Sequence, residues 1–265
     1  MANLFAALGF DIDTEEKFSA QSLMVAEAGE RIALPGGGEY RRWSPGAGIE
    51  LWAQITGNEI VGMNPHFAGD ATIRAGISAR FRDPAFSALD GMYQVWPEPV
   101  TDDPETGSTT FVIDAPDFAL HSRLALPVIA PVQVAAFAFE LAGFHSEEAY
   151  VESQTGDLKY AAESLVPSGM FGEDMSAADP MRPEAHFTGR VLDSELRINP
   201  STGNPFRRLR VRTWGGEMDV VAEPSLIGGE VVEGGIVSGW FWLSGRVNFA
   251  GAEPRPPWWR RILRR

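Results

Sequence analysis

The segment from 186 to 247 constrains the fold most, because it consists of strand-like runs separated by short turns rich in asparagine and glycine. These runs cover 186–198, 206–214, 217–222 and 234–247. The first three predict an antiparallel meander, and the fourth predicts one more long strand or a pair broken near Gly239. A meander followed by a late, glycine-bounded strand is typical of a small OB-like β-barrel, which we expect over 186–250.

The N-terminal part mixes helix and strand signals. Asp13-Thr-Glu-Glu16 resembles a helix start, and the apolar spacing after it predicts a helix at 14–28. A second helix is predicted at 156–165, where four apolar residues share one helical face. Alternating or apolar runs predict strands at 39–43, 48–55, 58–64, 70–82, 109–114 and 128–144.

The fold class that follows is α+β and predominantly β, in four parts along the chain. We expect an N-terminal mixed domain at 1–170, an acidic proline-containing linker at 171–185, the OB-like barrel at 186–250 and a basic tail at 251–265.

Composition limits the functions open to such a fold. The 265-residue chain has no cysteine, which excludes disulfides, thiolate metal sites and cysteine nucleophiles. It carries a formal charge of −14, and removing the +5 of the five arginines at 255–265 leaves −19 on the rest. Such a charge repels nucleic acid, which is therefore an unlikely partner. The first residues lack the pattern of a secretory signal, so we expect a cytoplasmic location.

Four phrases occur in an order that resembles an uncharacterised family of bacterial cytosolic proteins with an OB-like C-terminal region. The phrases are Gly48-Ile-Glu-Leu-Trp52, Glu163-Ser-Leu-Val-Pro-Ser-Gly169, Asp219-Val-Val-Ala222 and Ser238-Gly-Trp-Phe-Trp-Leu-Ser-Gly-Arg246. The resemblance implies a bacterial origin and carries no activity or functional residue with it.

Glu50 and His66 form the one local pair that could hold a metal. A carboxylate on one strand and an imidazole near the next could face each other and bind a divalent metal with open positions, as in the glyoxalase and dioxygenase enzymes. The competing interpretation is that Glu50 is an outward strand residue and His66 a loop histidine. No histidine is part of a local zinc motif, and we assign no catalytic residue.

A basic stripe ending in an aromatic is expected on the strand at 206–214. Period-two alternation places Arg208, Arg210, Arg212 and Trp214 on one face, and Trp240 and Trp242 share a face of the late strand. In an OB-like barrel this surface could bind single-stranded nucleic acid or another ligand. The alternative is that the arginines pair with carboxylates of the same chain such as Glu195, Glu217 and Asp219.

The tail combines apolar and basic residues: Trp258, Trp259, Arg260 and Arg261 start its most amphipathic stretch. Such a segment can bind an anionic membrane surface or a protein partner, or it can fold back onto the acidic body.

These observations favour a non-enzymatic cytosolic binding or adaptor protein that recognises its partner through the barrel strands and the tail. It would need no cofactor. The alternatives are a metal-dependent enzyme, which would need a divalent metal at Glu50 and His66, and a single-stranded nucleic-acid binder.

Overall fold

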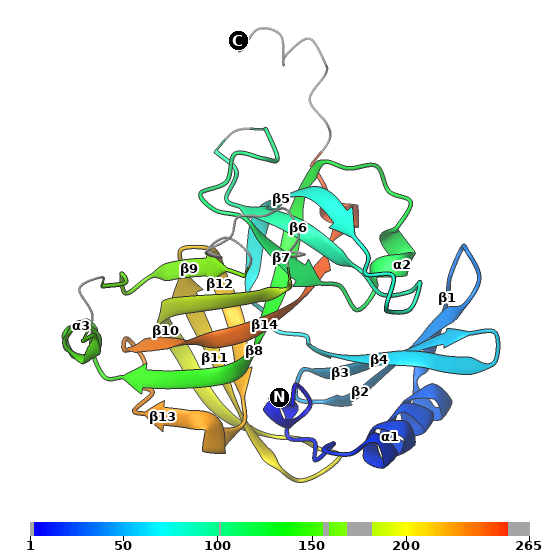
Figure 1. Cartoon of the computed structure of the whole chain (residues 1–265), viewed down its shortest axis with the longest axis horizontal. Coiled ribbons are helices and arrows are strands. Elements are labelled where there is room, and N and C mark those ends of the chain that lie inside the picture. The colour runs from blue at the N-terminus through cyan, green and yellow to red at the C-terminus, as the bar shows by residue number, and fades with distance from the viewer. Residues whose placement is uncertain (1–2, 101, 156–158, 169–181, 254–265) are drawn as a thin grey trace, which may run out of the picture.

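A computed structural model describes residues 3–100, 102–155, 159–168 and 182–253. Strands greatly outnumber helices among these residues, so the prediction of a predominantly β protein is confirmed. The strands form two sheets, a small one near the N-terminus and a large one that takes strands from the rest of the chain (Figure 1). None of the helices in the described ranges has the length and apolar content needed to cross a bilayer.

The small sheet is antiparallel and follows chain order. Its strands are β1 (Glu30–Ala33), β2 (Glu39–Gly46), β3 (Ile49–Thr56) and β4 (Glu59–Phe67). Helix α1 (Glu15–Ala28) begins as predicted, although its cap is Thr14, whose hydroxyl accepts the Lys17 N–H at 3.2 Å. Val25 of α1 packs with Leu51 of β3 in an apolar cluster, so α1 covers one face of this sheet.

The large sheet contains ten strands among the described residues. They are β5 (Thr72–Phe81), β6 (Met92–Pro97), β7 (Phe111–Asp114), β8 (Val128–Phe144), β9 (Ser164–Pro167), β10 (Glu184–Ile198), β11 (Pro205–Thr213), β12 (Gly216–Ala222), β13 (Ile227–Gly229) and β14 (Ile236–Val247). The predicted meander is confirmed, since β10, β11 and β12 pair antiparallel in order. Strand β14 continues through Gly239 without a break.

Strands β8 and β14 join the N-terminal and C-terminal parts of the chain, and both run through the middle of Figure 1. Strand β8 pairs with β5, β12, β13 and β14, while β14 also pairs with β7 and β10. The pairings therefore lead from β8 through β12, β11, β10 and β14 back to β8. Because β8 precedes residue 186, the late strands do not complete this path alone. The domain limits themselves stay a prediction.

One helix was assigned wrongly from the sequence. Residues 156–158 lie outside the described ranges, but Ser164–Pro167 form strand β9 and the nearby helix is α3 (Glu147–Ser153). Leu165 is buried and opposite Phe187 of β10, and this pairing outweighs the weak preference of a ten-residue segment for helix. Strands β1 and β6 were also not predicted. Of the expected linker, Glu184 and Ala185 belong to β10.

The core of the large sheet is formed by side chains from β5 to β14. The short helices lie at its margins: α2 (Phe118–His121) and the 3-10 turns η1 (Ala6–Leu8), η2 (Pro224–Leu226) and η3 (Phe249–Gly251). The face of β3 that is turned away from α1 lies toward β14 and α2. This arrangement creates a layer between the two sheets, and many of the side chains in that layer are polar.

Candidate functional site

Two strands supply the polar layer through simple alternation. On β14, Phe241 and Leu243 enter the core of the large sheet, so Trp242, Ser244 and Arg246 point to its other side. On β3, Leu51 packs toward α1, and Glu50 therefore faces β14. Polar groups of the two sheets meet at this interface.

Glu50 and His66 are directly opposite each other in the register of β3 and β4, and both are buried. The Trp52 indole N–H donates to Glu50 Oε2 at 2.9 Å. Two guanidiniums flank the same carboxylate, with Arg42 Nη1 at 3.8 Å and Arg246 Nη1 at 3.6 Å. Both side chains thus face the interior layer, as a shared metal site would require. The competing interpretation is wrong, because Glu50 is buried and His66 is on strand β4.

The surroundings of this pair favour a neutral histidine next to an arginine-bound carboxylate. His66 Nδ1 is 2.9 Å from Ser244 Oγ, and its Nε2 is buried without a hydrogen-bond partner. Burial lowers the pKa of His66 to about 3, and the positive charge of Arg246 lowers it further, while the polar side chain of Gln133, close to the imidazole but outside hydrogen-bond geometry, opposes the shift. Two nearby guanidiniums also oppose a divalent cation. Within the described ranges, no three histidine or acidic residues gather as a metal site.

Arg246 connects this pair to a second set of residues around α2. Its Nε donates to Asp117 Oδ2 at 3.1 Å, and its guanidinium carbon lies 5.1 Å from the centre of the Trp52 ring. His121, one turn after Asp117, places Nε2 3.9 Å from the same carboxylate. Burial lowers the pKa of His121, although Asp117 counteracts this effect.

A pocket of about 380 Å³ opens beside Arg246 and is lined by residues from β5, α2, β8, β14 and η3. Two of the residues that line it each carry a buried side-chain atom without a hydrogen-bond partner: Oδ1 of Asp117 and Nε2 of Gln133. Asp117 is only 3% exposed, and Gln133 is opposite Arg246 in the register of β8 and β14. A buried unpaired acceptor, a buried unpaired donor and a partly exposed guanidinium thus belong to residues that line one cavity. Such groups are rare unless water or a ligand satisfies them.

A second pair of carboxylates, Asp90 and Asp114, lies near the same strands and is partly exposed. Asp90 accepts hydrogen bonds from Gln54 and, at 2.9 Å, from Asn64. Burial raises the pKa of Asp114 to about 7; the negative charge of Asp90 adds to this effect and a hydrogen bond from Trp242 opposes it. Perturbed groups of this kind concentrate at functional sites.

We expect Asp114→Asn to stabilise the protein in neutral and alkaline solution. The folded state keeps the Asp114 proton up to a pKa of about 7, whereas the unfolded chain releases it near 3.8, so wild-type stability falls as pH rises between these values. The variant avoids a cost of at most about 4 kcal/mol above neutral pH, and the difference vanishes near pH 4. Urea unfolding at several pH values measures it, and a constant difference would refute the assignment.

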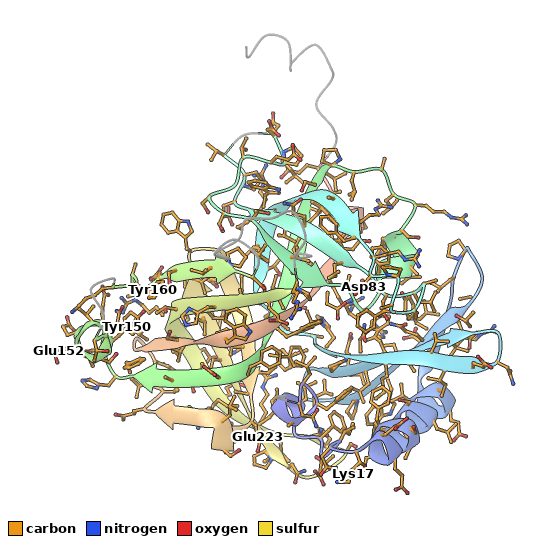
Figure 2. The ribbon with its side chains drawn as sticks, in the orientation of Figure 1. Lys17, Asp83, Tyr150, Glu152, Tyr160 and Glu223 are labelled. Atoms are coloured by element: carbon orange, nitrogen blue, oxygen red, sulfur yellow. The ribbon has the colours of Figure 1, made fainter. Side chains whose placement is uncertain are left out.

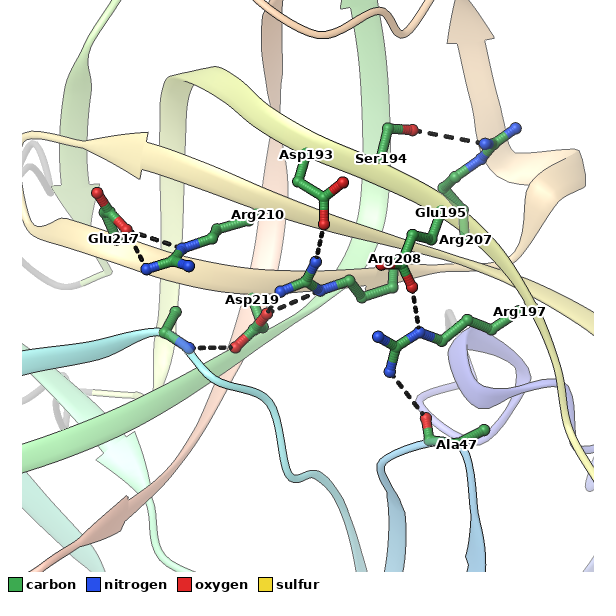
Figure 3. Close-up of polar contacts among 11 residues, drawn as sticks. Ala47, Asp193, Ser194, Glu195, Arg197, Arg207, Arg208, Arg210, Glu217 and Asp219 are labelled. Atoms are coloured by element: carbon green, nitrogen blue, oxygen red, sulfur yellow. Dashed lines mark hydrogen bonds and ion pairs between the residues drawn. The ribbon is translucent and has the colours of Figure 1, made fainter.

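The arginine stripe is on one face of β11 as predicted, and its guanidiniums bind carboxylates of the same chain, as Figure 3 shows for Arg208 and Arg210. Buried Arg208 contacts Asp193 and donates to Asp219 Oδ1 from Nε at 2.9 Å. Arg210 pairs with Glu217 at 2.7 Å and Arg212 with Glu163 at 2.9 Å. Two of the expected partners, Asp219 and Glu217, bind arginines of the stripe, whereas Glu195 pairs with Arg197. The arrangement matches the alternative of pairing within the chain, and nucleic-acid binding through these arginines stays a prediction.

The tryptophans occupy three different environments. Trp214 is 60% exposed at the turn after β11, whereas Trp240 donates to Glu184 at 3.2 Å and Trp242 packs against the N-terminal apolar cluster. Trp214 therefore does not share a surface with Trp242. Trp258, Trp259, Arg260 and Arg261 lie outside the described residues, so the predictions made for the tail are not addressed.

Comparison of the chain with protein-family models, with curated proteins and with solved structures gives no match. The resemblance to a bacterial family stays a prediction. Sequence reasoning also missed Arg246, Asp117, His121 and Gln133. Two signals were available, since Trp242, Ser244 and Arg246 alternate on one strand face and Asp117 is four residues before His121.

Proposed function

We propose that the protein is a binding protein whose ligand is a small zwitterion, an amino carboxylate, held in the pocket beside Arg246. The observation that carries this proposal is a pair of buried atoms without hydrogen-bond partners on residues that line the pocket, Asp117 Oδ1 and Gln133 Nε2; a ligand reaches them through a small rotation of these side chains. A buried polar atom without a partner costs about 1–3 kcal/mol, and a ligand that satisfies both atoms regains that free energy.

The charges of the wall select the ligand class. A ligand ammonium group can donate to the free oxygen of Asp117, while its carboxylate can accept from Gln133 and from the partly exposed Arg246. Arg246 is already balanced by Asp117 and Glu50, so a ligand of zero net charge leaves this balance intact. The His121 and Phe249 rings pack at an angle, with their centres 4.8 Å apart, and give the pocket an apolar side for the rest of the ligand.

The sequence favoured a binding protein, and we place its binding site in a pocket beside strand β14. The cycle of pairings through β8, β12, β11, β10 and β14 supports an OB-like barrel as its scaffold. The amphipathic sequence of the tail supports binding of a partner there, and the absence of a signal-like pattern in the first residues supports a cytoplasmic location. The metal-enzyme alternative is not preferred, because Arg42 and Arg246 already neutralise Glu50.

Thermal unfolding of the full chain in the presence of each common amino acid tests the proposal. We expect at least one amino acid to raise the melting temperature in a saturable way, because a ligand that binds the folded state stabilises it by mass action. The analogue without the ammonium group and the analogue without the carboxylate should each lose the effect; for alanine these are propionate and ethylamine.

Asp117→Asn should remove most of the stabilisation by the amino acid, because the neutral amide cannot form an ion pair with the ligand ammonium group. Asp83→Asn is the matched control, since Asp83 is exposed and does not line the pocket; its side chain is labelled in Figure 2. The proposal is wrong if no amino acid stabilises the wild type, or if the single-charge analogues act as strongly as the amino acid.

A further inference from the structure

A second cavity, of about 520 Å³, is a groove between α3 and the strands β8, β10 and β14. Aromatic rings and one carboxylate dominate its wall: Phe139, Phe144, Tyr150, Tyr160, His186 and Glu140. It shares none of its lining residues with the pocket beside Arg246. The groove is therefore a separate candidate site.

Tyr160 forms the exposed side of the groove, and hydrogen bonds to its backbone fix its position. Tyr160 is 54% exposed. The Gln154 side chain accepts the Tyr160 N–H at 2.6 Å and donates to the Tyr160 carbonyl at 3.1 Å. The ring centre lies 6.0 Å from that of His186. The wall is thus positioned before any ligand binds.

The opposite wall is fixed by packing and hydroxyl contacts. Tyr150 is buried, and its ring meets Phe144 edge to face at 5.3 Å. Its hydroxyl is 3.1 Å from Thr188 Oγ1, which is 3.0 Å from Ser238 Oγ. Figure 2 shows Tyr150 and Tyr160 close together at the α3 end of the molecule.

The electrostatics of the groove favour a positive charge. Glu140 is exposed, and the described residues that line the groove include no lysine or arginine. Burial lowers the pKa of His186, an effect that Glu140 opposes, so the imidazole is neutral at pH 7 and presents an uncharged ring. The nearby Lys159 ammonium donates to the Val151 carbonyl at 3.3 Å. Aromatic faces and a carboxylate, in a chain of net charge −14, attract cations and repel anions.

We propose that this groove binds an alkylammonium cation, with its methyl or methylene groups against the faces of Tyr160 and His186 and its charge near Glu140. Cation–π contacts and the carboxylate together make the groove prefer a cation over a neutral group of the same shape, because the neutral group gains only the apolar contact. This inference is independent of the ligand proposed for the Arg246 pocket.

Calorimetric titration of the full chain with choline and with 3,3-dimethylbutan-1-ol, its uncharged analogue of the same shape, tests the proposal. We expect saturable binding of choline, affinity for the neutral alcohol about tenfold or more lower, and weaker choline binding at high salt. Equal affinity for the two compounds would show a neutral apolar site and overturn the proposal, and so would the absence of choline binding.

Two variants locate the site on exposed residues, so folding is not at risk. Glu140→Gln and Tyr160→Leu should each weaken choline binding about fivefold, whereas Tyr160→Phe, which keeps the ring face, should bind as wild type. Glu152→Gln is the matched charge control, since Glu152 lies on α3 but does not line the groove (Figure 2). Loss of binding in Glu152→Gln to the same extent as in Glu140→Gln would contradict the proposed position of the cation.

Discussion

Arg208→Met should destabilise the protein by about 3–5 kcal/mol, the cost of leaving a buried carboxylate without its cation. The carboxylate is that of Asp219, which is 0% exposed. Its Oδ1 binds Arg208 from two nitrogens, at 2.9 and 2.6 Å, and its Oδ2 accepts the Ala71 N–H at 2.9 Å. Methionine retains most of the length of the side chain and removes the charge. Urea unfolding monitored by tryptophan fluorescence measures the loss.

Arg210→Met is the matched control because it removes the same group two residues further along the same strand face. The Arg210 and Glu217 side chains are 38% and 35% exposed, so water replaces much of their interaction and the expected loss is below about 1 kcal/mol. Similar losses for the two variants would show that burial of Arg208 does not govern the stability of the meander.

His66→Asn should make the protein more stable than the wild type in acid by an amount that grows as pH falls. The folded state keeps His66 neutral down to a pKa of about 3, whereas the unfolded chain takes up the proton near 6.5, so the wild type loses stability as pH falls between these values. Asparagine does not titrate and can retain a hydrogen bond to Ser244. Between about pH 7 and pH 4 the wild type should lose about 3 kcal/mol relative to the variant.

The pH dependence of the Asp114→Asn variant provides the control for His66. The two groups act in opposite directions, because a carboxyl with a raised pKa favours folding in acid and a histidine with a lowered pKa favours folding in base. If His66→Asn and wild type unfold with parallel pH profiles, His66 is accessible to protons in the folded state and the buried polar layer is described wrongly.

The sequence predicted the strands of the C-terminal part well, because alternation and turn residues are local signals. The run of 206–214 became β11 with its arginines on the predicted face, and β8 occupies the predicted range of 128–144. What alternation cannot give is the partner of a strand. That β8 pairs with β12 and β14 is set by contacts between distant residues, such as Ala136 with Val220 and Leu243.

The candidate site was predicted only in part for the same reason. Glu50 and His66 were singled out from their positions on neighbouring strands, and they are indeed opposite each other. Arg246 is 180 residues after His66, and nothing local in the sequence indicates that Ser244 contacts this histidine or that Arg246 reaches Glu50. The packing of the small sheet against β14 brings these residues together.

The most direct test of the proposed function is a nuclear magnetic resonance titration of the wild-type protein with the amino acid that stabilises it most. The side-chain amide of Gln133 and the Nε–H of Arg246 report on the pocket. We expect both resonances to shift in a saturable way as the amino acid is added, with one dissociation constant that matches the thermal stabilisation. In the Asp117→Asn variant, adding the amino acid should not shift them. Stabilisation without a shift of either resonance would place the ligand elsewhere and contradict the proposal.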